Sequence, residues 1–127
     1  MDRFARRVYN VAGIYGLIVM LPQYFMEERI GRDTPPPITH LEHFYGFIGV
    51  VVAWQVAFLV IARDPARFRA LMPVTVLEKL VFALPVAILY AQGRVATSVL
   101  PFAAIDLVLG TLFLLSYRRL GATQASS

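Results

Sequence analysis

Three ionisable residues stand within long apolar stretches of the sequence, where charges are rare. Glu78 and Lys79 are neighbours in one apolar stretch, and Asp106 stands in the next one along the chain. A charge inside hydrocarbon is costly, so such a residue is a candidate for function and needs a partner. A buried carboxyl beside a cation and an apolar wall can exchange a proton with a lipid-soluble substrate, or hold the polar group of an apolar ligand.

Helix geometry favours one ion pair among these three residues. Successive residues of a helix point about 100° apart, so we expect Glu78 and Lys79 not to face each other. Lys79 and Asp106 are therefore predicted to form a salt bridge, which could serve only to lock two helices together. Glu78 is then left over as a proton-carrying site, a ligand-binding acid or a hydrogen-bonded structural acid, and the sequence leaves these alternatives open.

Trp54 and Gln55, in another apolar stretch, are predicted to reach the same depth in the membrane. Gln55 is expected to point away from the small-residue face of its helix, towards a hydrogen bond with Glu78 or Asp106. Small residues let membrane helices approach closely. We expect this contact between Gly46, Gly49, Ala53 and Ala57 on one helix and Gly13 and Gly16 on another.

A second cluster, His40, Glu42 and His43, stands near the start of one apolar stretch. The spacing of the two histidines puts both imidazoles on one helix face. A zinc site needs three or four ligands, so we predict no metal site here. Because histidine titrates near neutral pH, the pair could sense pH together with Glu27 and Glu28, which are expected nearby.

Several classes of protein are excluded by what the sequence lacks. It has no cysteine, which excludes a disulfide framework, a thiolate metal site and a thiol nucleophile. It has no phosphate-binding glycine loop and no Ser/His/Asp arrangement, and we expect no cofactor. The net charge of +4 does not indicate nucleic-acid binding, because the arginines stand at the ends of apolar blocks and not on one basic face.

Four apolar stretches are long enough to carry these side chains across a membrane. Of the 127 residues, 58% are hydrophobic and 16% are charged, against about a quarter charged in soluble domains. A bilayer core about 30 Å thick needs roughly 20 apolar residues in a helix. The sequence predicts helices at 8–26, 39–62, 68–91 and 97–117. We therefore expect an all-α protein, one four-helix membrane bundle over residues 1–127, with a frayed polar tail at 121–127.

The sequence also indicates where the second helix begins. Thr39 and Glu42 have the spacing of a capping box, in which each side chain binds a free backbone N–H at the helix start. The prolines at 35–37 just before them cannot continue a helix. We therefore expect the second helix to begin near Thr39, with Glu42 largely explained by capping.

The arginines predict the orientation of the bundle, because basic residues in short loops stay on the cytoplasmic side. Eight arginines flank one side and three the other: Arg3, Arg6, Arg7, Arg63, Arg67, Arg69, Arg118 and Arg119 against Arg29, Arg32 and Arg94. Both termini are therefore predicted to be cytoplasmic. An aromatic belt is expected on the outer side, made by Tyr24, Phe25, Phe44, Tyr45 and Tyr90.

The second apolar stretch and the turn after it resemble a known family. The segments are HFYGFIG at 43–49, AWQ at 53–55 and IARDPARFR at 61–69. They are similar to the small four-helix bacterial inner-membrane proteins of the DoxX-like type, which share a polar residue near the outer end, a glycine-rich second helix and an Arg/Pro-rich cytoplasmic turn. The resemblance implies a bacterial inner-membrane location. Some of these proteins are linked to quinone-dependent oxidoreductase complexes, and no functional residue is carried over.

Three functions remain open from the sequence. The leading hypothesis is a non-enzymatic membrane bundle whose polar core binds an apolar ligand or a partner membrane subunit. The second is an enzyme acting on a quinone or sterol-like molecule, with Glu78 or Asp106 as proton donor or acceptor beside Trp54 and Phe82. The third is a proton-coupled transporter formed by oligomerisation. In each case the lipid bilayer is the first partner, and a homo-oligomer is compatible with all three.

Overall fold

The computed structural model describes residues 2–126 of the chain, and the side chains of residues 3–122. All regular elements in this range are helical. The helices, with 3-10 turns written η, are α1 (Asp2–Met20), η1 (Leu21–Phe25), α2 (Glu27–Asp33), α3 (Leu41–Arg63), η2 (Arg69–Leu71), α4 (Met72–Ala91), η3 (Thr97–Val99) and α5 (Leu100–Ser126). The prediction of an all-α chain is confirmed for these residues.

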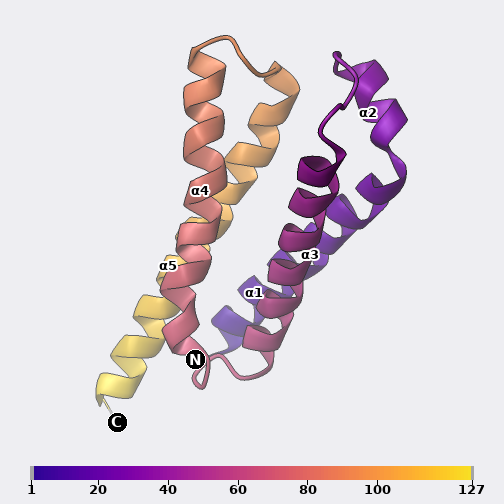
Figure 1. Cartoon of the computed structure of the whole chain (residues 1–127). Coiled ribbons are helices and arrows are strands. Elements are labelled where there is room, and N and C mark those ends of the chain that lie inside the picture. The colour runs from indigo at the N-terminus through magenta and orange to yellow at the C-terminus, as the bar shows by residue number, and fades with distance from the viewer. Residues whose placement is uncertain (1, 127) are drawn as a thin grey trace.

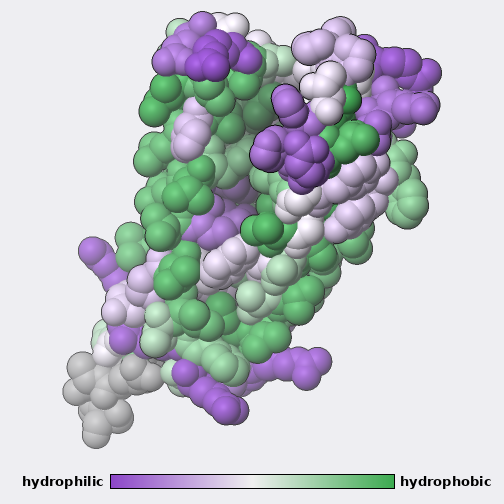
Figure 2. Space-filling view, in the orientation of Figure 1, coloured by the Kyte–Doolittle hydropathy of each residue, from purple (hydrophilic) through white to green (hydrophobic). Residues whose placement is uncertain are grey.

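Four helical segments are long and apolar enough to cross a membrane. They are Arg3–Phe25, Leu41–Arg63, Arg69–Ala91 and Thr97–Ala122. Large apolar side chains on every one of them face outwards, among them Ile18, Val50, Val81 and Val108. Figure 2 shows hydrophilic residues gathered at the two ends of the molecule and hydrophobic residues between them. This pattern suits a protein surrounded by hydrocarbon.

The helices form two antiparallel hairpins, α1 with α3 and α4 with α5. The hairpins are joined mainly through contacts between α1 and α5. Both termini lie at one end of the bundle, and the hairpins diverge towards the other (Figure 1). We call these the termini end and the far end. The side of the membrane that each end faces stays a prediction.

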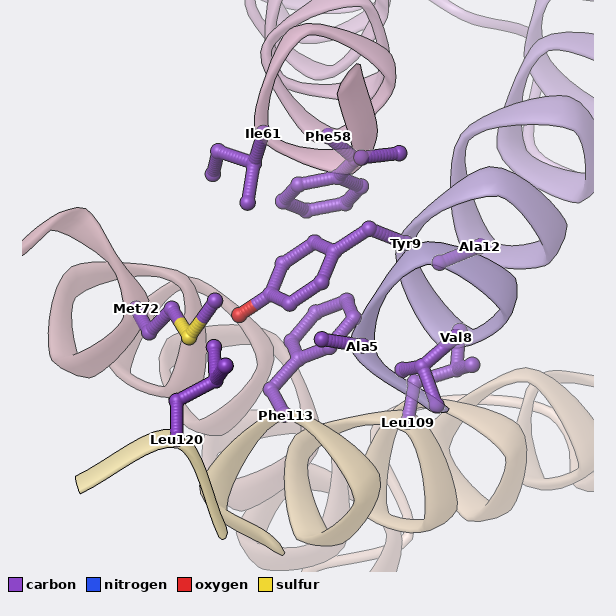
Figure 3. Packing of buried hydrophobic residues seen from close by; sticks show 11 residues of the cluster. Ala5, Val8, Tyr9, Ala12, Phe58, Ile61, Met72, Leu109, Phe113 and Leu120 are labelled. Atoms are coloured by element: carbon purple, nitrogen blue, oxygen red, sulfur yellow. The ribbon is translucent and has the colours of Figure 1, made fainter. Parts of the chain in front are cut away.

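The core lies near the termini end, where all four long helices supply side chains. Tyr9 is fully buried between Phe58 and Phe113, with ring centroids 6.0 and 4.3 Å away (Figure 3). Its hydroxyl lies 2.8 Å from Thr75 Oγ1, and the Thr75 hydroxyl donates to the Met72 carbonyl. Both hydroxyls thus have hydrogen-bond partners, as buried polar atoms normally do. No pattern in the sequence marks Tyr9 as its centre.

Several helix boundaries differ from those predicted. α1 already begins at Asp2, and α2 is an additional short helix in the first connection. α3 begins at Leu41 with His40 as its N-cap, and no side chain caps it. The predicted capping box of Thr39 and Glu42 is therefore wrong, because the chain that leaves the prolines becomes helical only two residues after Thr39. α5 continues to Ser126. The structure describes the tail only to residue 126, and its predicted fraying at 121–127 stays a prediction.

The two glycines of α1 meet large side chains of α3 and not its small-residue face. A Cβ at Gly16 would overlap the Gln55 amide, and one at Gly13 would meet Leu59. At Gly46 a Cβ would have no described atom within 4 Å. The predicted contact between two small-residue faces is therefore wrong. The glycines of α1 instead leave room for bulky residues of α3, which also brings the helices close together.

We expect Gly13→Ala to destabilise the α1–α3 hairpin by about 1–3 kcal/mol, the usual cost of overpacking. The added Cβ would lie 2.9 Å from the backbone oxygen of Gln55 and 2.7 Å from Leu59 Cδ2, and a helix backbone cannot move aside cheaply. Gly46→Ala is the matched control, because the space there is open. Thermal unfolding of the two variants in detergent measures the difference, and equal melting temperatures would contradict this packing.

Candidate polar site between the helices

Lys79 lies between two carboxylates within the apolar part of the bundle. Its Nζ is 3.4 Å from Asp106 Oδ1 on α5 and 3.5 Å from Glu78 Oε2 on α4. The side chains of Lys79, Glu78 and Asp106 are only 6%, 15% and 18% exposed. The predicted pair of Lys79 and Asp106 is confirmed. The expectation that Glu78 and Lys79 do not face each other is wrong, because their long side chains bend towards a common point. We call these three residues the polar site.

The position of Lys79 is fixed by a glycine and an aromatic ring. Gly110 of α5 is buried, and a Cβ there would lie 3.3 Å from Lys79 Cβ, so the lysine stem lies directly on the α5 backbone. The Nζ atom is 5.2 Å from the centre of the Phe58 ring. A cation over an aromatic face is stabilised most where water is excluded. The ammonium group is thus held between the aromatic core and two acids.

The polar site holds more acid than base. Two carboxylates surround one ammonium group, and the buried Glu78 Oε2 accepts no hydrogen bond from any described residue. Buried polar atoms normally have a hydrogen-bond partner. Figure 2 shows hydrophilic surface between the two hairpins, at mid-height and surrounded by hydrophobic residues. The arrangement can therefore accept one more hydrogen-bond donor.

Gln55 does not belong to the polar site. It is 1% exposed and lies between α3 and α1, against Gly16. Its Nε2 donates to the Val51 carbonyl at 3.0 Å, and its Oε1 accepts no hydrogen bond from the described residues. The predicted hydrogen bond to Glu78 or Asp106 is wrong, because the Gln55 amide fills the space that Gly16 leaves on α1 and donates to the α3 backbone.

Aromatic residues of α1, α3 and α4 lie near the polar site. Trp54 lies one turn before Phe58 on α3, and the two ring centroids are 6.4 Å apart. Phe82 lies one turn after Glu78 on α4, and its ring centroid is 6.5 Å from that of Phe47 on α3. This ring contact joins the hairpins between the polar site and the far end. Tyr15 of α1 is partly buried and packs against the core that contains Phe58. No pattern in the sequence marks Tyr15, because only the folded bundle brings α1 next to α5.

His40, Glu42 and His43 come together at the far end but remain in solvent. Glu42 Oε1 is 3.7 Å from His40 Nδ1 and 3.9 Å from His43 Nε2, and all three side chains are more than 70% exposed. Ion pairs this exposed contribute little to stability. Glu27 does not join them, because it accepts a hydrogen bond from Tyr45. In the described part of the chain, no three His, Asp or Glu side chains are placed to hold a metal ion.

Four apolar helices with outward-facing apolar side chains fit a small multi-pass membrane protein. A search of protein-family models, of curated proteins and of solved structures found no match for the chain. The polar site is therefore the feature that bears most directly on function.

Proposed function

We propose that this membrane protein binds an apolar small molecule whose polar group donates a hydrogen bond to the polar site. The observation that carries the proposal is the buried Glu78 Oε2 atom, which the Lys79 ammonium contacts only as an ion pair at 3.5 Å, shared with Asp106, and which accepts no hydrogen bond from the described residues. A hydrogen-bond donor on a ligand would supply the partner that this oxygen lacks. The apolar remainder of such a ligand would contact the aromatic wall that Phe82 and Phe47 provide.

A purely structural role would need fewer charged groups. One lysine and one aspartate are enough to join α4 to α5, and a second carboxylate in hydrocarbon only adds to the cost of the pair. Glu78 therefore supports a role beyond helix packing. An enzyme or a proton-coupled transporter would use the same carboxylates, and ligand binding is the step that all three functions share.

Orientation and location are part of the same proposal. The arginine distribution supports cytoplasmic termini, since the termini end carries Arg3, Arg63 and Arg118, among others. A bacterial inner membrane and a DoxX-like relationship rest on the sequence resemblance alone.

We expect the ligand to co-purify with the wild-type protein and to be depleted about tenfold in Glu78→Gln, which removes a charged acceptor worth roughly 1.5–3 kcal/mol. The proteins are purified from native membranes in mild detergent, and bound small molecules are identified by mass spectrometry. Glu42→Gln is the control, because that acid is exposed and remote from the polar site. Equal recovery from all three proteins, with unchanged helicity and elution volume, would refute ligand binding by Glu78.

A further inference from the structure

A shallow pocket at the far end lies apart from the polar site. Its volume is about 260 Å³, and it is lined by Tyr24, Phe25, Glu27, Glu28 and Tyr45. The first membrane-crossing segment ends at Phe25, and α2 begins at Glu27. The pocket therefore lies where hydrocarbon gives way to lipid headgroups and water. We call it the headgroup pocket.

One side of the headgroup pocket is aromatic. The rings of Tyr24 and Tyr45 are 6.2 Å apart and within 15° of parallel, and Phe44 packs edge-on against Tyr45 at 4.9 Å. The Tyr45 hydroxyl donates to Glu27 Oε1 at 2.9 Å. This bond holds an aromatic ring and a carboxylate in fixed relation. The faces of aromatic rings carry negative potential and attract cations.

The other side of the headgroup pocket is acidic and lacks a cation of its own. Neither Glu27 nor Glu28 forms an ion pair within the described residues, whereas the nearby Arg29 pairs with Asp33 at 3.6 Å. Two carboxylates and two tyrosine rings thus line one cavity without a positive group. This combination of charge and aromatic surface matches an alkylammonium group.

We propose that the headgroup pocket binds an alkylammonium group, presented by the headgroup of a zwitterionic phospholipid. Phe25 is 91% exposed and Leu21 is 45% exposed on the adjoining turn. These side chains offer apolar surface to the acyl chains of a lipid whose headgroup occupies the pocket. The aromatic rings would contact the ammonium carbons, and the carboxylates of Glu27 and Glu28 would balance its charge.

The test measures two probes on the intact protein. Tetramethylammonium binding is followed by saturation-transfer NMR on detergent-solubilised protein, and lipid binding by native mass spectrometry with phosphatidylcholine or phosphatidylglycerol. We expect phosphatidylcholine to bind in preference to phosphatidylglycerol, and both ammonium probes to bind about fivefold more weakly to Tyr24→Leu and to the double variant Glu27→Gln/Glu28→Gln. Glu42→Gln is the matched control, because it removes an exposed acid at the same end but outside the pocket.

The two probes distinguish the source of the ammonium group. Binding of both supports a lipid headgroup. Binding of tetramethylammonium alone supports recognition of a free alkylammonium compound and overturns the lipid assignment. Equal binding of phosphatidylglycerol, or wild-type affinities in the double variant, overturns the proposal. If Tyr24→Leu does not fold, the double variant still decides, because Glu28 is exposed and Glu27 half-buried.

Discussion

Lys79→Met is expected to destabilise the protein by about 3–5 kcal/mol, the usual cost of leaving a buried charge without its partner. The substitution keeps the length of the side chain but leaves Glu78 and Asp106 facing one another in an apolar environment. These acids are otherwise held by contacts of 3.5 and 3.4 Å to Nζ. The free energy of unfolding in mixed detergent micelles measures the effect. Arg94→Met, at an exposed turn, is the control and should unfold like wild type.

The double variant Lys79→Met/Asp106→Asn shows whether the pair acts directly. Removing the second charge relieves the repulsion between the carboxylates, so the double variant should be more stable than Lys79→Met alone. Contacting residues show coupling in such a cycle, whereas distant ones add. Additive losses would mean that Lys79 and Asp106 stabilise the bundle independently.

Phe113→Ala is expected to cost about 3–5 kcal/mol, because it removes a large ring from a packed core. Phe113 is fully buried, stacks on Tyr9 at 4.3 Å and contacts Phe58 at 5.0 Å. These three rings join the two hairpins. In hydrocarbon, helices associate through packing and not through the exclusion of water, so the lost contacts cannot be replaced by lipid without loosening the hairpins.

Val108→Ala on the same helix is the control for Phe113→Ala. Val108 is 59% exposed, and its truncation removes contacts with the surroundings only. We expect a change within about 0.5 kcal/mol, as for substitutions outside the core. The same unfolding assay compares the two variants. If Phe113→Ala were no less stable than Val108→Ala, the aromatic core would not be what joins the hairpins.

The four crossing helices and the ion pair could be predicted because both depend on position along the helix axis. Residues of adjacent antiparallel helices that are equally far from a common turn lie at similar depth. Counting from the turn at Gln92 therefore places Lys79 near Asp106, as the structure confirms. The length of each apolar stretch likewise gives a helix its span.

Rotation about the helix axes could not be predicted from the sequence. Whether Gln55 faces Glu78 or Gly16 depends on which side of α3 meets α1, and many rotations bury a similar apolar area in hydrocarbon. The same uncertainty concealed Tyr9, which becomes central only when all the helices meet. The contact between Glu78 and Lys79 depends on the bending of flexible side chains, which the angle between neighbouring positions does not describe.

The placement of the shared aromatic core has a mechanical consequence. Tyr9, Phe58 and Phe113 join the hairpins near the termini end, whereas the smaller cluster of Ala83, Val86 and Ala103 joins only α4 to α5. The hairpins are thus joined most extensively at the termini end and more loosely, through the Phe47–Phe82 ring contact, towards the far end. A small tilt of one hairpin about this core moves the far end of that hairpin most. The Phe47–Phe82 contact would therefore separate before the contacts within the aromatic core changed.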